Sequence, residues 1–356
     1  GQFDDSRMAI TLALSADSKK TALLNYCNVE GLIKKDGEIK GLNFTDSINS
    51  KKYQIKSKVV INATGVFAEE IIRMDQPKIE KMIQPSQGVH IVLERRFLKS
   101  KHAILIPQTS DGRVLFAVPW KNYVVVGTTD TQVKKASEEP KALKEEVDFI
   151  LKNAGKYMSV KPKKDDIKSV FAGLRPLAAT SNKQSTKEVS RSHKIDISPS
   201  GLISVLGGKW TTYRKIAEDA LNTAISINKL KKKKCKTERT KLFGFKRNVS
   251  WSDPMHVYGS LKKKVESLGG INDNKSLSNK FYISNNIIEW SIIHEMALTV
   301  EDVLARRTRC VFLDSKESKR IAPIVAQKMA DVLGEDDKWI DAELKKFNKL
   351  IKNYIV

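Results

Sequence analysis

Two segments of this chain of 356 residues combine a buried-strand pattern with a turn of small residues and a following helix. Residues 58–65 read KVVINATG, and a helical pattern follows over 67–74. Residues 201–209 read GLISVLGGK, and a long helical pattern follows from 211 or 212 to about 227. A strand that passes through a glycine turn into a helix is a building block of α/β folds. These two junctions therefore constrain the fold more than any other feature of the sequence.

The sequence between the two junctions follows a different pattern. Residues 88–130 contain short β-rich runs, which turn sequences such as Asp111-Gly112 separate at hairpin spacing. Such spacing predicts an antiparallel sheet. A helical pattern over 138–157 predicts a helix on one face of that sheet, and further strands are expected over 169–174 and 190–197.

The two ends of the chain carry simpler patterns. Asp5–Ser15 is predicted to form a short amphipathic helix with Asp4 or Asp5 as its N-cap. Leu23–Phe44 is predicted to form a hairpin around the turn dipeptide Asp36-Gly37. The last hundred residues are predicted to form an all-α unit, with helical periods over 286–312, 323–333 and 337–354.

The chain is strongly basic, with 64 Lys and Arg residues against 41 Asp and Glu residues. The densest basic segment, 229–264, holds 13 basic and 2 acidic residues. A solvated linker is the first interpretation of this segment, adsorption to an anionic membrane surface the second, and nucleic-acid binding the third. No uncharged apolar run approaches the ~18 residues that a membrane-spanning helix needs.

Several catalytic motifs are missing from the sequence. His294-Glu295 begins like a zinc-protease helix, but Leu298 stands where the second histidine is required, and we expect no metal. The sequence contains no GxSxG, no GxxxxGK[ST] and no GxGxxG. The last of these would hold the pyrophosphate of a dinucleotide at a helix N-terminus.

Four segments carry residue types that suit catalysis or ligand binding: Gly88-Val89-His90, Gly173-Leu174-Arg175-Pro176, Ser190-Arg191-Ser192 and Gly207–Thr212. Imidazole exchanges protons near neutral pH, and the two guanidinium groups are permanent cations. The last segment combines bare backbone with a helix N-terminus, which favours negative charge. Each segment also has a structural interpretation, since a single histidine in a strand is commonly structural and either arginine suits an ordinary ion pair.

The order and wording of these segments resemble those of the FAD-dependent glycerol-3-phosphate dehydrogenases, within the D-amino-acid-oxidase-like flavoproteins. The resemblance runs through nearly the whole chain, in DDSRM, VVINATGVFAEEI, PSQGVHIVL, DGRVLFAVPW, VVVGTTDT, FAGLRPL, VSR, GLISVLGGKWTTYRKIAEDA and HEMALTVEDVLARRTRCVFLD. It implies a mixed α/β (α+β) fold with an incomplete Rossmann-like FAD-binding domain, an interleaved antiparallel substrate domain and a C-terminal all-α cap. The implied segments are 1–80 for the FAD domain with a hairpin excursion, 81–200 for the substrate domain, 201–228 for the return to the FAD domain, 229–264 for the basic linker and 265–356 for the cap.

The resemblance also implies roles for single residues. His90 is the candidate base, Arg175 the cation for the developing C2 oxyanion or the phosphate, and Arg191 a second cation for the phosphate. Lys209 would stabilise negative charge on reduced flavin. The residues expected to bind FAD are Thr64, Gly65, Gly207, Gly208, Lys209, Thr211 and Thr212.

Family members carry a strand–GxGxxG–helix unit and more than a hundred residues ahead of the DDSRM-like segment. We therefore expect this chain to correspond to the C-terminal two-thirds of such an enzyme, as a fragment or one half of a split protein. The implied reaction is oxidation of sn-glycerol 3-phosphate to dihydroxyacetone phosphate by hydride transfer to FAD, with electrons passed to a quinone. The alternatives are an oxygen-using glycerol-3-phosphate oxidase and a non-catalytic fragment or subunit. We further expect peripheral association with the cytoplasmic membrane, a homodimer and no nucleic-acid partner.

Overall fold

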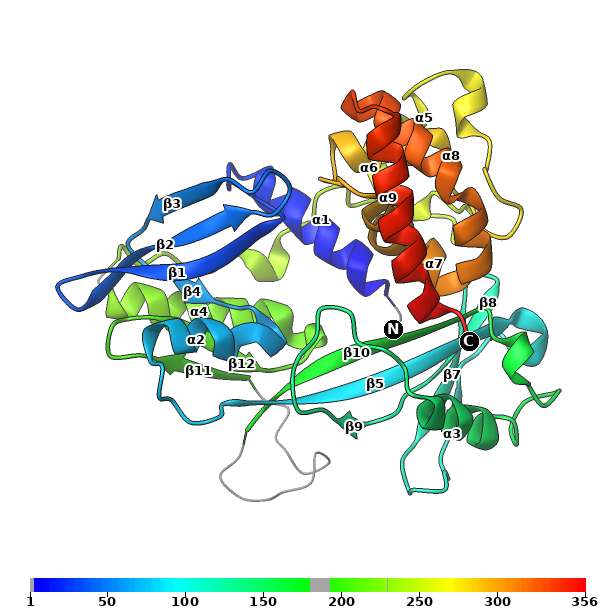
Figure 1. The fold of residues 1–356 in the computed structure, drawn as a ribbon, viewed down its shortest axis with the longest axis horizontal. Helices are drawn as coiled ribbons and strands as arrows, with labels where there is room; N and C mark the ends of the chain where they lie inside the picture. Colours follow the sequence, from blue (N-terminus) through cyan, green and yellow to red (C-terminus); the bar gives the residue numbers. More distant parts are fainter. Residues whose placement is uncertain (1–2, 180–192, 229) are drawn as a thin grey trace.

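The computed structural model describes residues 3–179, 193–228 and 230–356, and Figure 1 shows the fold. Within these ranges the strands form three sheets, and the chain after residue 207 contains helices and no further strand. The strands are β1 (Cys27–Lys35), β2 (Glu38–Asp46), β3 (Lys52–Lys56), β4 (Ile61–Asn62), β5 (Ile83–Glu94), β6 (Ile104–Ile106), β7 (Leu115–Trp120), β8 (Tyr123–Gly127), β9 (Thr131–Gln132), β10 (Ser169–Ala178), β11 (His193–Ile197) and β12 (Ile203–Gly207). The helices are α1 (Asp5–Asp17), α2 (Ala68–Asp75), α3 (Lys144–Ala154), α4 (Tyr213–Ile227), α5 (Lys262–Glu266), α6 (Asn285–Ile293), α7 (Cys310–Leu313), α8 (Ser315–Leu333) and α9 (Asp337–Leu350).

The central sheet is antiparallel, with the strand order β10-β5-β8-β7-β6 and with β9 paired to β5. This confirms the antiparallel sheet predicted from the hairpin spacing. Side chains alternate between the two faces along β5. Val89, Ile91 and Leu93 are fully buried on one face, where they pack with Val147 and Ile150 of α3. The predicted helix over 138–157 therefore covers this face, although it begins only at Lys144.

The opposite face of the central sheet packs against the C-terminal helices, and Figure 1 shows α3 and these helices on opposite sides of the sheet. Val92 of β5 belongs to the same core cluster as Val303, Val325 and other residues of the helical unit. Phe171 of β10 makes an edge contact with Phe312 of α7, with ring centroids 4.9 Å apart. The helical unit thus covers one part of this face.

A smaller sheet joins the two strand–turn–helix junctions, because β4 pairs in parallel with β12 and β11 lies on the other side of β12. This confirms the α/β arrangement predicted from the two junctions. The strand predicted over 58–62 is much shorter than expected, since only Ile61 and Asn62 join the ladder and Ile61 is exposed. The hairpin around Asp36-Gly37 forms as predicted, with both residues at positive φ.

The single helical period predicted over 286–312 is wrong, because α6 ends at Ile293 and the chain turns before a π-helix over Asp302–Arg307. Met296 adopts a φ of 58° in this turn. The turn brings the side chain of Glu295 into the interior, where it accepts hydrogen bonds from Arg7 and Trp290. The helix predicted from Pro323 also begins earlier than expected, at Ser315, because Asp314 caps it by accepting from the Glu317 amide at 3.0 Å.

The basic segment 229–264 contains both exposed and packed residues. Lys231–Lys234 are exposed, as expected of a solvated linker. Met255 and Tyr258 instead belong to a core cluster with Ile287 and Trp290 of α6. The domain boundaries stay predictions. None of the described helices is both long enough and apolar enough to cross a membrane.

Candidate functional site

His90 and Arg175 lie on the same face of the central sheet, opposite to α3. Gly88 and His90 of β5 alternate with the buried Val89 and Ile91, and the antiparallel register sets Gly88 beside Gly173. Arg175 lies two residues beyond Gly173 on β10 and therefore points to the same side. The structure thus brings together two of the predicted site residues.

Glycines make room for these two side chains on the sheet. A Cβ atom added at Gly88 would lie 2.5 Å from Nη2 of Arg175 and 2.6 Å from the Thr128 hydroxyl oxygen. A Cβ added at Gly127 would collide with the ring of His90. A Cβ added at Gly173 would meet no atom within 4 Å. Two glycines therefore let the imidazole and guanidinium groups lie against the strands, and the third leaves an open surface beside them.

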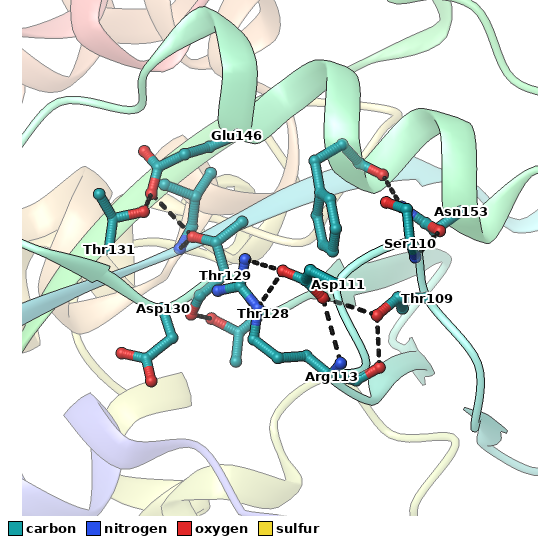
Figure 2. Close-up of polar contacts among 12 residues, drawn as sticks. Thr109, Ser110, Asp111, Arg113, Thr128, Thr129, Asp130, Thr131, Glu146 and Asn153 are labelled. Atoms are coloured by element: carbon teal, nitrogen blue, oxygen red, sulfur yellow. Dashed lines mark hydrogen bonds and ion pairs between the residues drawn. The ribbon is translucent and has the colours of Figure 1, made fainter. Parts of the chain in front are cut away.

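Arg175 is held by the turn that follows β8. Its Nη2 donates to the hydroxyl of Thr128 at 3.1 Å and to the carbonyl of Thr129 at 3.2 Å. Its Nη1 lies 3.5 Å from a carboxylate oxygen of Asp130. Figure 2 shows this turn, with Asp130 pointing away from its two threonine neighbours. The Arg175 side chain is about one-third exposed, whereas its Nη1 atom is buried, so the protein orients the guanidinium group while part of the side chain faces solvent.

His90 is held in a form that accepts protons. Its ring stacks on Phe171, with centroids 5.2 Å apart and 15° between the planes. Burial and then the charge of Arg175 lower its pKa from 6.5 to about 4, against a smaller opposing effect of Asp5. The imidazole is therefore neutral at pH 7 and has the protonation state that a general base needs.

The residues predicted to bind FAD lie at one edge of the small sheet. Asn62 pairs with Ser204 in the parallel ladder, so the turns after β4 and β12 emerge at the same edge. Thr64 is exposed, and its hydroxyl donates to the buried side-chain oxygen of Asn62 at 2.7 Å. Gly65 follows with a φ of 61°.

The turn after β12 leaves its backbone bare. Gly207 and Gly208 both have positive φ, and a Cβ at Gly208 would lie 2.7 Å from Ile216 of α4. Lys209, Thr211 and Thr212 are exposed at the start of the helical segment. The hydroxyl of Thr212 donates to the backbone carbonyl of Lys209 at 3.0 Å.

The two groups of residues approach each other through β10. The short 3-10 helix Gly65–Phe67 contacts both β10 and β12, and β10 also contacts β12. The strand that carries Arg175 therefore contacts the helical turn that begins at Gly65 and the strand β12 that leads into the second glycine turn. Arg191 lies outside the described residues, so its predicted role stays a prediction.

This arrangement fits a flavin dinucleotide. A planar ring system needs space above the sheet that no side chain fills, and Gly173 offers such a position on the central sheet. Anionic groups need backbone N–H donors and positive charge, which the Gly207–Lys209 turn and the helix start supply. Residues 1–214 match the family described as FAD dependent oxidoreductase. The chain belongs to this family.

Residues 203–340 match the C-terminal domain of alpha-glycerophosphate oxidase. The chain is 34% identical to the probable mitochondrial glycerol-3-phosphate dehydrogenase of Dictyostelium discoideum over 389 residues, which covers 100% of this chain and 60% of the relative. It is 32% identical to the mitochondrial glycerol-3-phosphate dehydrogenase of Bos taurus over 383 residues, which covers 99% of this chain and 52% of that relative. The chain thus spans between half and two-thirds of the length of these relatives.

A solved structure gives the same fold. The glycerol-3-phosphate dehydrogenase of Bacillus halodurans, complexed with FAD, superposes with a TM-score of 0.85 at 25% identity. The match covers 100% of this chain and 74% of that protein. The mixed α/β fold with a C-terminal helical unit is therefore confirmed.

The residues that hold Arg175 carry no predicted role from the sequence. Thr128, Thr129 and Asp130 belong to the run VVVGTTDT, which resembles the family pattern without indicating a role for each residue. Two adjacent hydroxyl residues and a carboxylate directly after a predicted strand were the sequence features that could have indicated a polar turn able to hold a cation. Their contact with Arg175 spans 46 and 47 residues, so only the folded chain reveals it.

Proposed function

We propose that this chain takes part in oxidising the C2 alcohol of sn-glycerol 3-phosphate to the ketone of dihydroxyacetone phosphate. The observation that carries the proposal is the neutral His90 ring and the fixed Arg175 guanidinium group beside the open position at Gly173. The similarity to glycerol-3-phosphate dehydrogenases supports this substrate.

FAD would supply the acceptor for the hydride that leaves C2 of the substrate. Thr64, Gly65, Gly207 and Gly208 would line its site with bare backbone. Lys209, Thr211 and Thr212 would set positive charge and hydrogen-bond donors beside it. These residues orient the ligand and favour negative charge at this edge of the sheet.

The protein side chains accept the hydroxyl proton of the substrate and stabilise the negative charge that develops on it. An imidazole nitrogen of His90 takes the proton of the C2 hydroxyl group as the C2–H bond breaks. Arg175 donates hydrogen bonds to the oxygen on which negative charge develops, or to the phosphate. Arg191 would supply a second cation for the phosphate.

Flavin reduction tests this proposal. The protein expressed from its full reading frame and loaded with FAD should show flavin absorption bands, and glycerol 3-phosphate should bleach them under anaerobic conditions. Glycerol without phosphate is the matched control and should leave the bands unchanged. A protein that holds no flavin would support the alternative of a non-catalytic subunit, and stoichiometric hydrogen peroxide in air would support the oxidase alternative.

We further propose a quinone as electron acceptor and a peripheral position at the cytoplasmic face of a membrane. Phe243, Phe245 and Trp251 are exposed aromatic residues within the basic segment. They line a cavity of about 1090 Å³ together with Lys241, Lys246 and residues of α1. Apolar rings beside lysines suit the headgroup region of an anionic membrane. The expected homodimer stays a prediction.

Vesicle co-sedimentation tests the membrane contact. We expect the chain to bind vesicles that contain phosphatidylglycerol at low salt and to leave them at about 1 M salt, where the charges are screened. Replacing Trp251 by alanine should weaken binding to the phosphatidylglycerol vesicles at low salt. Equal binding to neutral phosphatidylcholine vesicles, or no binding to either, would contradict the proposal.

A further inference from the structure

We infer that Glu146, on the face of the central sheet opposite to His90, is a positioning residue that sets the guanidinium group of Arg175. It acts through the turn 128–131, which crosses from one face of the sheet to the other. The inference rests on the proposed function for its consequences in catalysis. The contacts that carry it are independent of any ligand.

Glu146 lies in the first turn of α3 and is 5% exposed. One carboxylate oxygen accepts from the hydroxyl groups of Thr129 at 2.8 Å and Thr131 at 2.6 Å. The other accepts from the Gln87 side-chain amide at 2.8 Å and the Leu143 backbone amide at 3.0 Å. All four partners donate, so the site suits an ionised carboxylate, and Figure 2 shows both threonines pointing toward it.

Thr129 connects this carboxylate to the strand that carries His90. Its hydroxyl oxygen accepts from the Val89 backbone amide at 2.9 Å, and its only hydroxyl proton goes to Glu146. Thr129 is 2% exposed, so water does not replace either bond. The position of the Thr129 backbone, including its carbonyl group, is therefore fixed by Glu146 and Val89 together.

The carbonyl of Thr129 is one of the groups that orient Arg175. Nη2 of Arg175 donates to this carbonyl at 3.2 Å and to the Thr128 hydroxyl at 3.1 Å. Because Thr129 and Thr131 both point toward Glu146, Asp130 between them points to the opposite face, as Figure 2 shows. There its carboxylate accepts from Ser86 and lies 3.5 Å from Nη1 of Arg175.

A role limited to capping α3 accounts for only part of this geometry. One of the four hydrogen bonds of Glu146, from the Leu143 amide, serves the helix N-terminus. The other three reach β5 and the turn that holds Arg175. A residue that only stabilised the fold would change the unfolding free energy without changing how Arg175 reacts, and this difference makes the inference testable.

The experiment compares Glu146→Gln with Glu145→Gln, the same substitution at the exposed neighbour on α3. In Glu146→Gln an N–H₂ group replaces one carboxylate oxygen. This group does not accept hydrogen bonds from the donors that contact that oxygen in the wild-type protein, so the turn 128–131 loses part of its support. Thr129→Val and Thr129→Ser form a second pair, because serine keeps the hydroxyl group and valine removes it. Each variant is measured in the FAD-loaded protein expressed from its full reading frame.

The first readout needs no activity. Phenylglyoxal labels accessible guanidinium groups, and peptide mass spectrometry reports the rate at Arg175. We expect this rate to rise several-fold in Glu146→Gln and Thr129→Val, and to stay at the wild-type value in Glu145→Gln and Thr129→Ser.

The second readout is kinetic. We expect kcat/KM for glycerol 3-phosphate to fall by about 10- to 100-fold in Glu146→Gln and Thr129→Val, the loss typical of a slightly misplaced active-site group. In an Arg175→Ala background the same substitutions should cost little more. Unchanged labelling of Arg175 in Thr129→Val would overturn the inference even if Glu146→Gln does not fold. The inference would also be overturned if Glu146→Gln or Thr129→Val lowered kcat/KM as strongly in the Arg175→Ala background as in the wild-type protein. If the wild-type flavin is not reduced by glycerol 3-phosphate, the proposed function fails, whereas the labelling result still decides the role of Glu146.

Discussion

Replacing His90 by glutamine lowers kcat for glycerol 3-phosphate oxidation by about 10²- to 10⁴-fold, the contribution expected of a positioned general base. Glutamine retains hydrogen-bonding capacity and similar length, but its amide does not accept a proton at neutral pH. The substitution therefore removes the proton acceptor, while a side chain of similar length takes the place of the ring that lies against Gly127. Steady-state turnover and the rate of anaerobic flavin reduction measure the effect.

The pH profile separates this role from a structural one. The pKa of His90 is lowered to about 4 by burial and then by Arg175, so the acid limb of kcat/KM should lie near pH 4. Replacing Arg175 by glutamine removes the second cause and should move the limb toward 6.5 in the residual activity. In the unfolded chain His90 takes up its proton near pH 6.5, so the folded state loses stability as the pH falls from 6.5 to 4.

His102→Gln is the matched control, because His102 is an exposed histidine in the same polypeptide. It should keep wild-type turnover and the wild-type acid limb. Full turnover in His90→Gln would remove His90 from the mechanism. An acid limb that stays in place in that variant would assign it to another group.

Removing the carboxylate of Glu295 should lower the free energy of unfolding by about 3–5 kcal/mol, since it leaves a buried charge without its partner. Glu295 accepts from Arg7 at 2.7 and 3.0 Å and from the Trp290 indole at 2.8 Å. Its side chain is 1% exposed and that of Arg7 is 10% exposed. This pair joins α1 to the helical unit across 288 residues, so its loss should affect the packing of the N-terminal helix.

Urea unfolding of Glu295→Ala, followed by tryptophan fluorescence, measures this loss. Asp148→Ala is the matched control, since its ion pair with Lys164 is close to half exposed on both sides, and its loss should stay within about 1 kcal/mol. The double replacement Arg7→Met with Glu295→Leu removes both charges of this pair and should recover much of the stability. Equal losses in Glu295→Ala and Asp148→Ala would contradict the assignment of a buried, structurally important pair.

Much of the fold could be predicted because its determinants are local in sequence. The short β-rich runs of β5 and β8, the Asp36-Gly37 turn and the glycines after β4 and β12 each favour their own conformation. The family resemblance was readable for the same reason, since its motifs are contiguous runs. Local patterns failed where a distant partner set the conformation, as at Glu295 and Met296, where a buried arginine 288 residues away holds the turn.

The candidate site shows the same division between local and distant determinants. The residue types of His90, Arg175 and the Gly207–Lys209 turn were evident in the sequence as groups suited to proton transfer, anion binding and close approach of a ligand. The placement of His90 and Arg175 on one face of the central sheet, beside the open position at Gly173, depends on strand register, which a single strand does not specify. The supporting contacts of Thr128, Thr129 and Glu146 depend on chain segments that meet only after folding. Local sequence therefore specified the elements and the chemical groups, whereas the packing of distant segments specified which groups face one another, because hydrogen bonds and charges act through distances in space.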